Sequence, residues 1–234
     1  MASDELIQIV SATRLTEAGF WEQSALGRSL KRLSYDKRLS SSISFSNRLG
    51  LPTVYNSRIL AETSKEFLVF IHDDVWLDDY FFSERLLEGL KTYDVIGLAG
   101  NRRRLPKQAL WASIQTECLD KAVVLDHATN LSGAVAHGAS SSGGTVTFYG
   151  KSPARCELMD GLLLAARKAT LVSNSVLFDP RFEFHFYDLD FCRTATSRGL
   201  RIGTWPIAVT HESGGNLNSQ WVSGYSAYLE KWGA

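Results

Sequence analysis

The chain has 234 residues, of which 44% are hydrophobic, and its 25 basic residues equal its 25 acidic ones. This length suffices for one domain with a sizeable core and argues against two full domains. Because the charges balance, no overall field attracts the chain to nucleic acid or to an anionic membrane, so a partner must be recognised by a local site.

Three cysteines, Cys118, Cys156 and Cys192, are far apart and form no C-x-x-C pair, which predicts free thiols in a reducing compartment. The amino terminus is acidic where a signal peptide would be basic, and no apolar run reaches the length of a membrane helix. We therefore expect a cytoplasmic protein without a transmembrane segment. A peripheral position on the inner face of the membrane is the alternative.

Strand-like apolar runs alternate with amphipathic segments through the first hundred residues. This alternation predicts an α/β fold with a mixed, mainly parallel sheet flanked by helices. The predicted elements are, in chain order, strand 6–10, helix 24–33, strand 43–45, helix 57–64, strand 67–71, helix 80–90 and strand 94–99.

The periodicity weakens between residues 101 and 155, where the run 138–144 has the glycine and serine content of a flexible loop. We interpret 101–155 as a loop-rich excursion within a single domain that spans residues 1–234. The later predicted elements are strands at 145–149, 162–166, 201–205 and 207–210, and a helix at 188–198 that ends at Gly199.

One predicted strand ends in His72, Asp73 and Asp74. Ligand sites in open α/β sheets lie beyond the carboxyl ends of the strands. Because side chains alternate along a strand, His72 and Asp74 share one face and Asp73 points the other way. Mg²⁺ prefers carboxylate and phosphate oxygens, and an imidazole extends the choice to Mn²⁺, so we predict Asp74 as a metal ligand. The alternative is a solvated loop in which Asp78 or Asp79 caps the next helix.

The segment 178–192 places six aromatic residues around acidic ones. Burial and a neighbouring charge raise the pKa of a carboxylate, which suits a general base. We expect one of Asp188 and Asp190 to act as a base or to order an acceptor hydroxyl. The alternative role for Asp188 is a helix N-cap.

Three weaker features complete the candidate site. His211 ends a short apolar strand just before a glycine pair, which lets it turn toward a ligand with little steric hindrance. Asp160 before Gly161 is typical of a turn. Trp221 carries an aromatic plane that suits the C–H face of a sugar ring, and ordinary packing is the alternative.

Taken together, these segments resemble the bacterial family 2 glycosyltransferases of the GT-A superfamily. Residues 55–61 and 66–75 look like the family's asparagine helix and its D-x-D strand end. Residues 159–167 resemble its central apolar strand, 178–190 its FDE…EDxD segment, and 209–211 its late histidine. The likeness covers most of the chain outside 101–155.

The resemblance implies a GT-A fold with a nucleotide-binding half at residues 1–100 and an acceptor and catalytic half at 156–234, the latter with a carboxy-terminal lid. It implies an inverting transfer of a sugar from a nucleotide-diphosphate sugar to a hydroxyl of a glycan, a lipid-linked glycan or a protein, as in polysaccharide biosynthesis. The expected site residues are Asp188 as the base, Asp74 and His211 as ligands of Mn²⁺ or Mg²⁺, Thr13, Asn47, Asn56, His72 and Asp73 near the donor, and Asp160, Gly161, Asp190 and Trp221 near the acceptor.

The chain departs from the family pattern at two positions. His72 stands where the first aspartate of D-x-D is usual, and Tyr187 replaces the glutamate before the base. These departures motivate a second hypothesis, a catalytically idle subunit that binds a nucleotide-sugar or a carbohydrate. A nucleotidyltransferase is disfavoured because residues 11–16 lack a glycine-rich basic loop, and a haloacid-dehalogenase phosphatase because residues 73–77 lack D-x-D-x-T/V.

Overall fold

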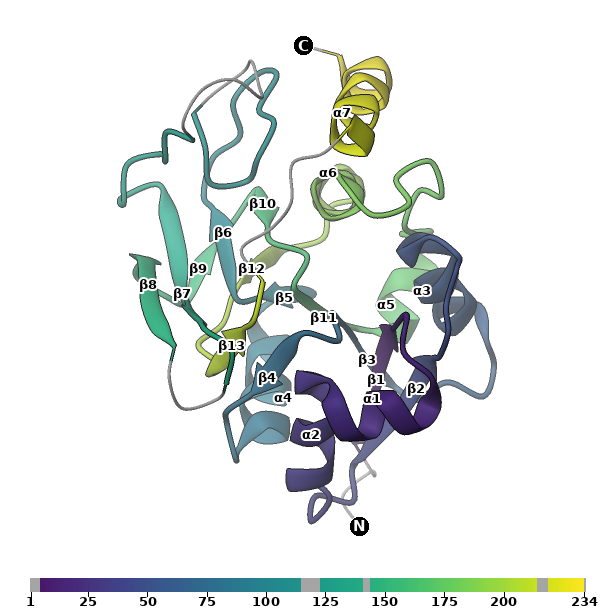
Figure 1. Cartoon of the computed structure of the whole chain (residues 1–234). Helices are drawn as coiled ribbons and strands as arrows, with labels where there is room; N and C mark the ends of the chain where they lie inside the picture. The colour runs from purple at the N-terminus through teal and green to yellow at the C-terminus, as the bar shows by residue number, and fades with distance from the viewer. Residues whose placement is uncertain (1–4, 115–122, 141–143, 214–218, 234) are drawn as a thin grey trace.

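The computed structural model describes residues 5–114, 123–140, 144–213 and 219–233, which form two sheets with helices packed around the larger one (Figure 1). The larger sheet contains, in spatial order, β2 Leu39–Ser44, β1 Ile7–Ala12, β3 Phe67–Ile71, β11 Leu163–Arg167, β5 Val95–Gly97, β12 Ile202–Thr204 and β9 Ala154–Arg155. The smaller sheet contains β10 Leu158–Met159, β6 Ala99–Asn101, β7 Leu131–His137, β13 Val209–His211 and β4 Val75–Leu77, with β8 Thr145–Gly150 paired to β7. The helices are α1 Glu17–Gln23, α2 Ala25–Arg32, α3 Leu51–Leu60, α4 Phe82–Thr92, α5 Lys168–Ser173, α6 Tyr187–Ser197 and α7 Ser219–Trp232.

The larger sheet is mixed. Strand β1 runs parallel to β2 and β3, and β12 runs parallel to β5, whereas β11 is antiparallel to both β3 and β5. Helix α3 packs against β1, and α4 packs against β5 and β11. The predicted α/β fold, a mixed sheet flanked by helices, is confirmed.

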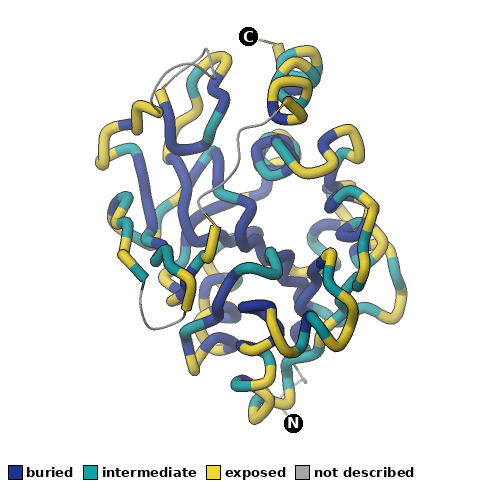
Figure 2. Tube along the Cα trace, viewed as in Figure 1, coloured by how far each residue is buried: buried dark blue, intermediate teal, exposed yellow. Residues whose placement is uncertain are grey.

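Strand β3 lies at the centre of the core. Its five residues Phe67–Ile71 are all apolar and at most 2% exposed, and the central strands form the dark interior in Figure 2. Each such side chain contributes about 1.5–3 kcal/mol by burial, which explains why this uninterrupted apolar run becomes a central strand. The core therefore fixes the strand end from which residues 72–74 emerge.

Several element predictions agree closely with the structure. Strand 67–71 is found with the predicted bounds, and the helices predicted at 24–33, 80–90 and 188–198 match α2, α4 and α6 within two residues at each end. Helix α3 begins at Leu51, six residues before the predicted start at 57, because Pro52 lies in its first turn, where proline needs no hydrogen-bond partner.

The region 101–155 differs from the loop-rich excursion expected from its sequence. It contains β7, β8 and β9, and β7 is the central member of the smaller sheet. Ser132 and Gly133 interrupt the apolar alternation in β7, and Gly133 has a φ of 101° that glycine adopts readily. The predicted loop at 138–144 lies partly outside the described residues, and Cys118 lies wholly outside them. Cys156 and Cys192 are buried free thiols.

Candidate active site

The junction of the two sheets brings His72, Asp74 and His211 together. After β3 the chain passes through residues 72–74 into β4, which pairs antiparallel with β13 so that Val75 lies opposite His211. The backbone N–H of Glu212 donates to the carbonyl of Asp74 at 3.0 Å, and that of His72 donates to the carbonyl of Leu162 at 3.2 Å. Two segments far apart in the sequence are thereby held side by side.

His72, Asp74 and His211 form a compact cluster of potential metal ligands. One ligand atom of each lies within 4.8 Å of the others, and Asp74 Oδ2 is 3.4 Å from His211 Nε2. The other carboxylate oxygen of Asp74, Oδ1, is buried and has no hydrogen-bond partner. An unpaired buried oxygen is unfavourable unless a cation or a donor meets it, so this set of atoms fits a divalent cation.

The cluster has shifted pKa values. Burial alone would raise the pKa of Asp74, but the hydrogen bond from His211 and the neighbouring imidazoles outweigh it and lower that pKa to about 2. Burial lowers the pKa of His72. The pKa of His211 is raised, because Asp74 more than offsets the effect of burial. At neutral pH the cluster therefore presents a carboxylate and at least one neutral imidazole.

Asp188 lies in the first turn of α6, directly after Tyr187, whose hydroxyl contacts His72 of this cluster. Its Oδ2 accepts a hydrogen bond of 3.1 Å from the backbone N–H of Gly161. Burial, assisted by the neighbouring charge of Asp160, raises the pKa of Asp188 to about 7. A carboxylate with a pKa near neutrality suits a general base. Asp188 is not the N-cap, because that position is held by Phe186 in a left-handed conformation, with a φ of 66°.

Asp160 and Gly161 are neighbours of Asp188 in the structure. Asp160 accepts hydrogen bonds from Trp111 Nε1 at 2.7 Å and from the backbone N–H of Leu162 at 2.9 Å. A Cβ atom at Gly161 would overlap the hydroxyl of Tyr187, so only glycine allows α6 to approach this closely. The turn expected at 160–161, between β10 and β11, is thus also where the chain contacts α6.

A cleft of about 620 Å³ opens beside the cluster, at the carboxyl ends of β1 and β2. Its size is within the usual range for a small-molecule site. Thr13, Asn47 and Asp73 line it, whereas His72 and Asp74 belong to the cluster of potential ligands. Burial raises the pKa of Asp73, and a hydrogen bond from the Thr13 hydroxyl partly offsets this effect.

Besides Arg181, which pairs with Asp179, two exposed arginines line the cleft and were not identified from the sequence, Arg14 and Arg48. Arg14 directly follows Thr13, and Arg48 directly follows Asn47, on loops after strands. Their position next to predicted site residues could have identified them from the sequence. Asn47 itself shapes its loop, since its amide donates to the carbonyl of Leu49 at 2.7 Å. The cleft therefore combines cationic groups with hydrogen-bonding groups.

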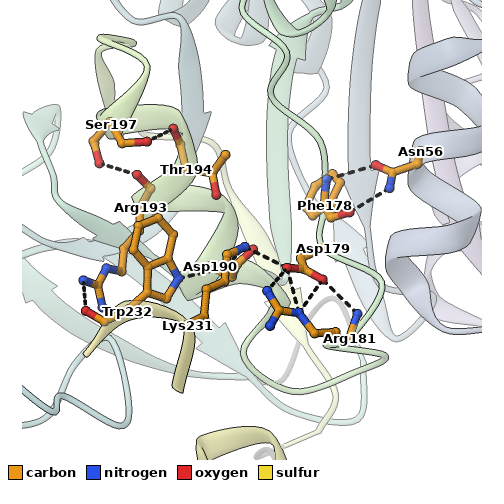
Figure 3. A network of polar contacts seen from close by, with 11 residues as sticks. Asn56, Phe178, Asp179, Arg181, Asp190, Arg193, Thr194, Ser197, Lys231 and Trp232 are labelled. Carbon is orange, nitrogen blue, oxygen red and sulfur yellow. Dashed lines mark hydrogen bonds and ion pairs between the residues drawn. The ribbon is translucent and has the colours of Figure 1, made fainter. Parts of the chain in front are cut away.

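Three predicted site residues belong neither to the lining of the cleft nor to the groups around Asp74 and Asp188. The side-chain amide of Asn56 forms two hydrogen bonds with the backbone of Phe178: Nδ2 donates to the carbonyl at 2.7 Å, and Oδ1 accepts from the N–H at 2.9 Å (Figure 3). Trp221 is 3% exposed and packs on Phe186, with ring centroids 5.0 Å apart. Asp190 is fully buried, and its partners lie on α7. These contacts give the three side chains structural roles.

Asp190 anchors α7 through Lys231 and Trp232 (Figure 3). Lys231 Nζ lies 2.7 Å from Asp190 and 2.8 Å from Asp179, and Trp232 Nε1 donates to Asp190 at 2.7 Å. The guanidinium of Arg193 lies 4.3 Å from the centre of the Trp232 ring. The other end of α7 lines the cleft through Gln220, Ser223, Gly224 and Ala227. The carboxy-terminal helix is therefore a wall of the cleft that is fixed at its far end.

The fold matches those of known glycosyltransferase structures. Over 96% of its length the chain is similar to the structure of GalNAc-T7 with UDP, GalNAc and Mn²⁺, at 9% identity and a TM-score of 0.52. It covers 47% of that chain, so it spans about half of its length. Over 92% of its length it is similar to the catalytic domain of Drosophila β1,4-galactosyltransferase 7 in complex with xylobiose, at 8% identity and a TM-score of 0.51, and it covers 77% of that chain. These similarities define the fold as GT-A.

The family follows from the sequence. The model of the glycosyltransferase-like family matches residues 33–230, and the chain belongs to this family. No curated protein matches the chain. Among the described residues, none of the helices combines the length and the hydropathy that crossing a membrane requires.

Proposed function

We propose that this chain transfers a sugar, with inversion, from a nucleotide-diphosphate sugar to an acceptor hydroxyl. The observation that carries the proposal is the position of Asp188, a carboxylate with a pKa raised to about 7, beside the cluster of His72, Asp74 and His211. Gly161 links the two, because its N–H binds Asp188 and its carbonyl binds Tyr187, which contacts His72. A base and a cation site in this arrangement suit glycosyl transfer.

The donor is assigned to the cleft at the carboxyl ends of β1 and β2. Thr13, Asn47 and Asp73 supply hydrogen-bonding groups for a nucleoside, and Arg14 and Arg48 supply positive charge that suits phosphates. The GalNAc-T7 structure with UDP, GalNAc and Mn²⁺ supports this donor class. Residues 1–100 thus form the nucleotide-binding half, with α7 as a wall over the donor.

Asp74 and His211 would hold Mn²⁺ or Mg²⁺ near the diphosphate. A divalent cation bound there supplies positive charge that stabilises the leaving diphosphate. The buried and unpaired Oδ1 of Asp74 supports this assignment.

Asp188 takes the proton of the acceptor hydroxyl. As that oxygen forms a bond to the anomeric carbon, the bond from this carbon to the diphosphate oxygen breaks, and the diphosphate leaves with the electron pair. Asp160 and Gly161 lie next to Asp188 and are assigned to the acceptor side. The acceptor classes are a glycan, a lipid-linked glycan or a protein, as in polysaccharide biosynthesis, and the xylobiose bound by the Drosophila enzyme supports a carbohydrate.

The test is release of nucleoside diphosphate from a panel of nucleotide-sugars with Mn²⁺, with and without carbohydrate acceptors. Asp188→Asn should retain donor binding and lower turnover by about 10²–10⁴-fold, the usual contribution of a general base. Glu88→Gln, an exposed carboxylate on α4, is the control and should behave as wild type. Full activity of Asp188→Asn would refute the assignment of the base. Nucleotide binding by the wild type without any turnover would instead identify an idle binding subunit.

A further inference from the structure

The two positions at which the chain departs from the family pattern contact each other. His72 Nε2 lies 2.7 Å from the hydroxyl oxygen of Tyr187. Tyr187 is 2% exposed, and the imidazole of His72 stacks on the ring of Phe184, with centroids 5.9 Å apart and an angle of 21° between the planes. His72 and Tyr187 are therefore a packed pair.

The hydrogen bonds of Tyr187 determine which nitrogen of His72 carries the proton. A phenol has one proton to donate. The hydroxyl of Tyr187 also lies 2.8 Å from the carbonyl oxygen of Gly161, which can only accept, so the phenol proton goes there. The same hydroxyl must then accept from His72, which places a proton on Nε2 and leaves the lone pair of Nδ1 available.

We infer that His72 is a third ligand of the divalent cation, through Nδ1, and that Tyr187 is the positioning residue that fixes its tautomer. This inference rests on the proposed cation site at Asp74 and His211. A metal-binding histidine commonly donates its other N–H to a fixed acceptor, which orients the ring. The phenol of Tyr187 takes that role here.

The resulting set of ligands has a chemical preference. Two imidazoles and one carboxylate suit Mn²⁺ and other first-row transition metals, whereas Mg²⁺ prefers oxygen ligands. The rings of His72 and His211 have centroids 6.2 Å apart, and Asp74 lies with them in the cluster. The chain should therefore bind Mn²⁺ in preference to Mg²⁺ through its own side chains, without a donor.

Calorimetric titration of the metal-free protein with MnCl₂ and with MgCl₂, without nucleotide or acceptor, tests the inference. Wild type should bind Mn²⁺ more tightly than Mg²⁺. Tyr187→Phe keeps the ring but loses the hydroxyl, and should weaken Mn²⁺ binding by about 10–100-fold. His72→Asp replaces an imidazole by a carboxylate and should lower the ratio of Mn²⁺ to Mg²⁺ affinity. Tyr228→Phe removes a buried phenol from α7 and serves as the control, with wild-type binding expected.

Nitrogen NMR of the histidine ring in the metal-free wild type gives a second measurement, and His72 should be the Nε2–H tautomer. Tighter Mn²⁺ binding by Tyr187→Phe would overturn the inference, since it would mean that the phenol competes with the cation for Nε2. Unchanged metal binding in His72→Asp, or no binding by wild type, would also overturn it. Metal binding that depends on His72, in a protein that turns over no donor, would uphold the inference and refute the proposed transferase activity.

Discussion

Replacing Asp188 by asparagine should stabilise the protein at alkaline pH. The pKa of Asp188 rises from 3.8 to about 7 on folding, mainly through burial. At about 1.36 kcal/mol per pKa unit, holding this carboxylate ionised in the folded state costs about 4 kcal/mol. The side chain keeps some solvent contact, so we expect about half of this, roughly 2 kcal/mol. Asparagine keeps the shape of the side chain and carries no charge.

The sign of the effect follows from proton binding. The folded state holds this proton more tightly than the unfolded chain, so the stabilisation is fully present below about pH 4 and is lost as the pH rises through about 7. The stability advantage of Asp188→Asn should therefore grow by about 2 kcal/mol between pH 4.5 and pH 8, whatever its value at the lower pH.

Thermal unfolding in EDTA, measured by circular dichroism at a series of pH values, tests this expectation. For a chain of this size about 2 kcal/mol corresponds to roughly 4–8 °C in Tm. A difference in Tm between Asp188→Asn and wild type that stays constant from pH 4.5 to pH 8 would refute the reasoning, because the carboxylate would then have an ordinary pKa in the folded state.

Three further changes have expected outcomes. Asp160→Asn removes the charge that helps to raise the pKa of the base, so the acidic limb of the profile of kcat/KM against pH should move to lower pH, and an unmoved limb would contradict this coupling. Gly161→Ala places a methyl group against the hydroxyl of Tyr187 and should cost about 1–3 kcal/mol, measured as a lower Tm, and a Tm equal to wild type would mean that α6 shifts freely. Lys231→Met leaves the buried Asp190 without its partly buried cationic partner, and should cost about 1–3 kcal/mol and speed proteolysis within α7. Adding Asp190→Asn should restore part of the stability, and no restoration would argue against the ion pair as the anchor.

Local patterns predicted the parts of the fold that local physics determines. The apolar run 67–71 became a strand with the predicted bounds, because its side chains need burial on both faces. His72 and Asp74 lie together in the cluster and Asp73 lines the cleft, as expected, although Asp73 and Asp74 are in a turn and not in a strand. The aromatic residues around Asp188 likewise indicated a carboxylate with a raised pKa.

Contacts between distant segments could not be predicted in this way. The ion pairs of Lys231 join α7 to Asp179, which precedes α6, and to Asp190 within α6. Nothing in the sequence around Lys231 indicates these contacts. Strand β7 owes its place to pairing with β6, β8 and β13, while its own residues break the alternation. Such features depend on which surfaces meet after folding, which periodicity does not encode.

The cluster of His72, Asp74 and His211 is assembled only where β4 pairs with β13, so its ligands come from segments that are far apart in the chain. A divalent cation bound there would join the amino-terminal half of the chain to its carboxy-terminal part. Metal affinity would then report that both parts have docked, and the cation would stabilise the complete fold over any partly folded form. Cleavage between the halves should therefore weaken metal binding even if every ligand is retained.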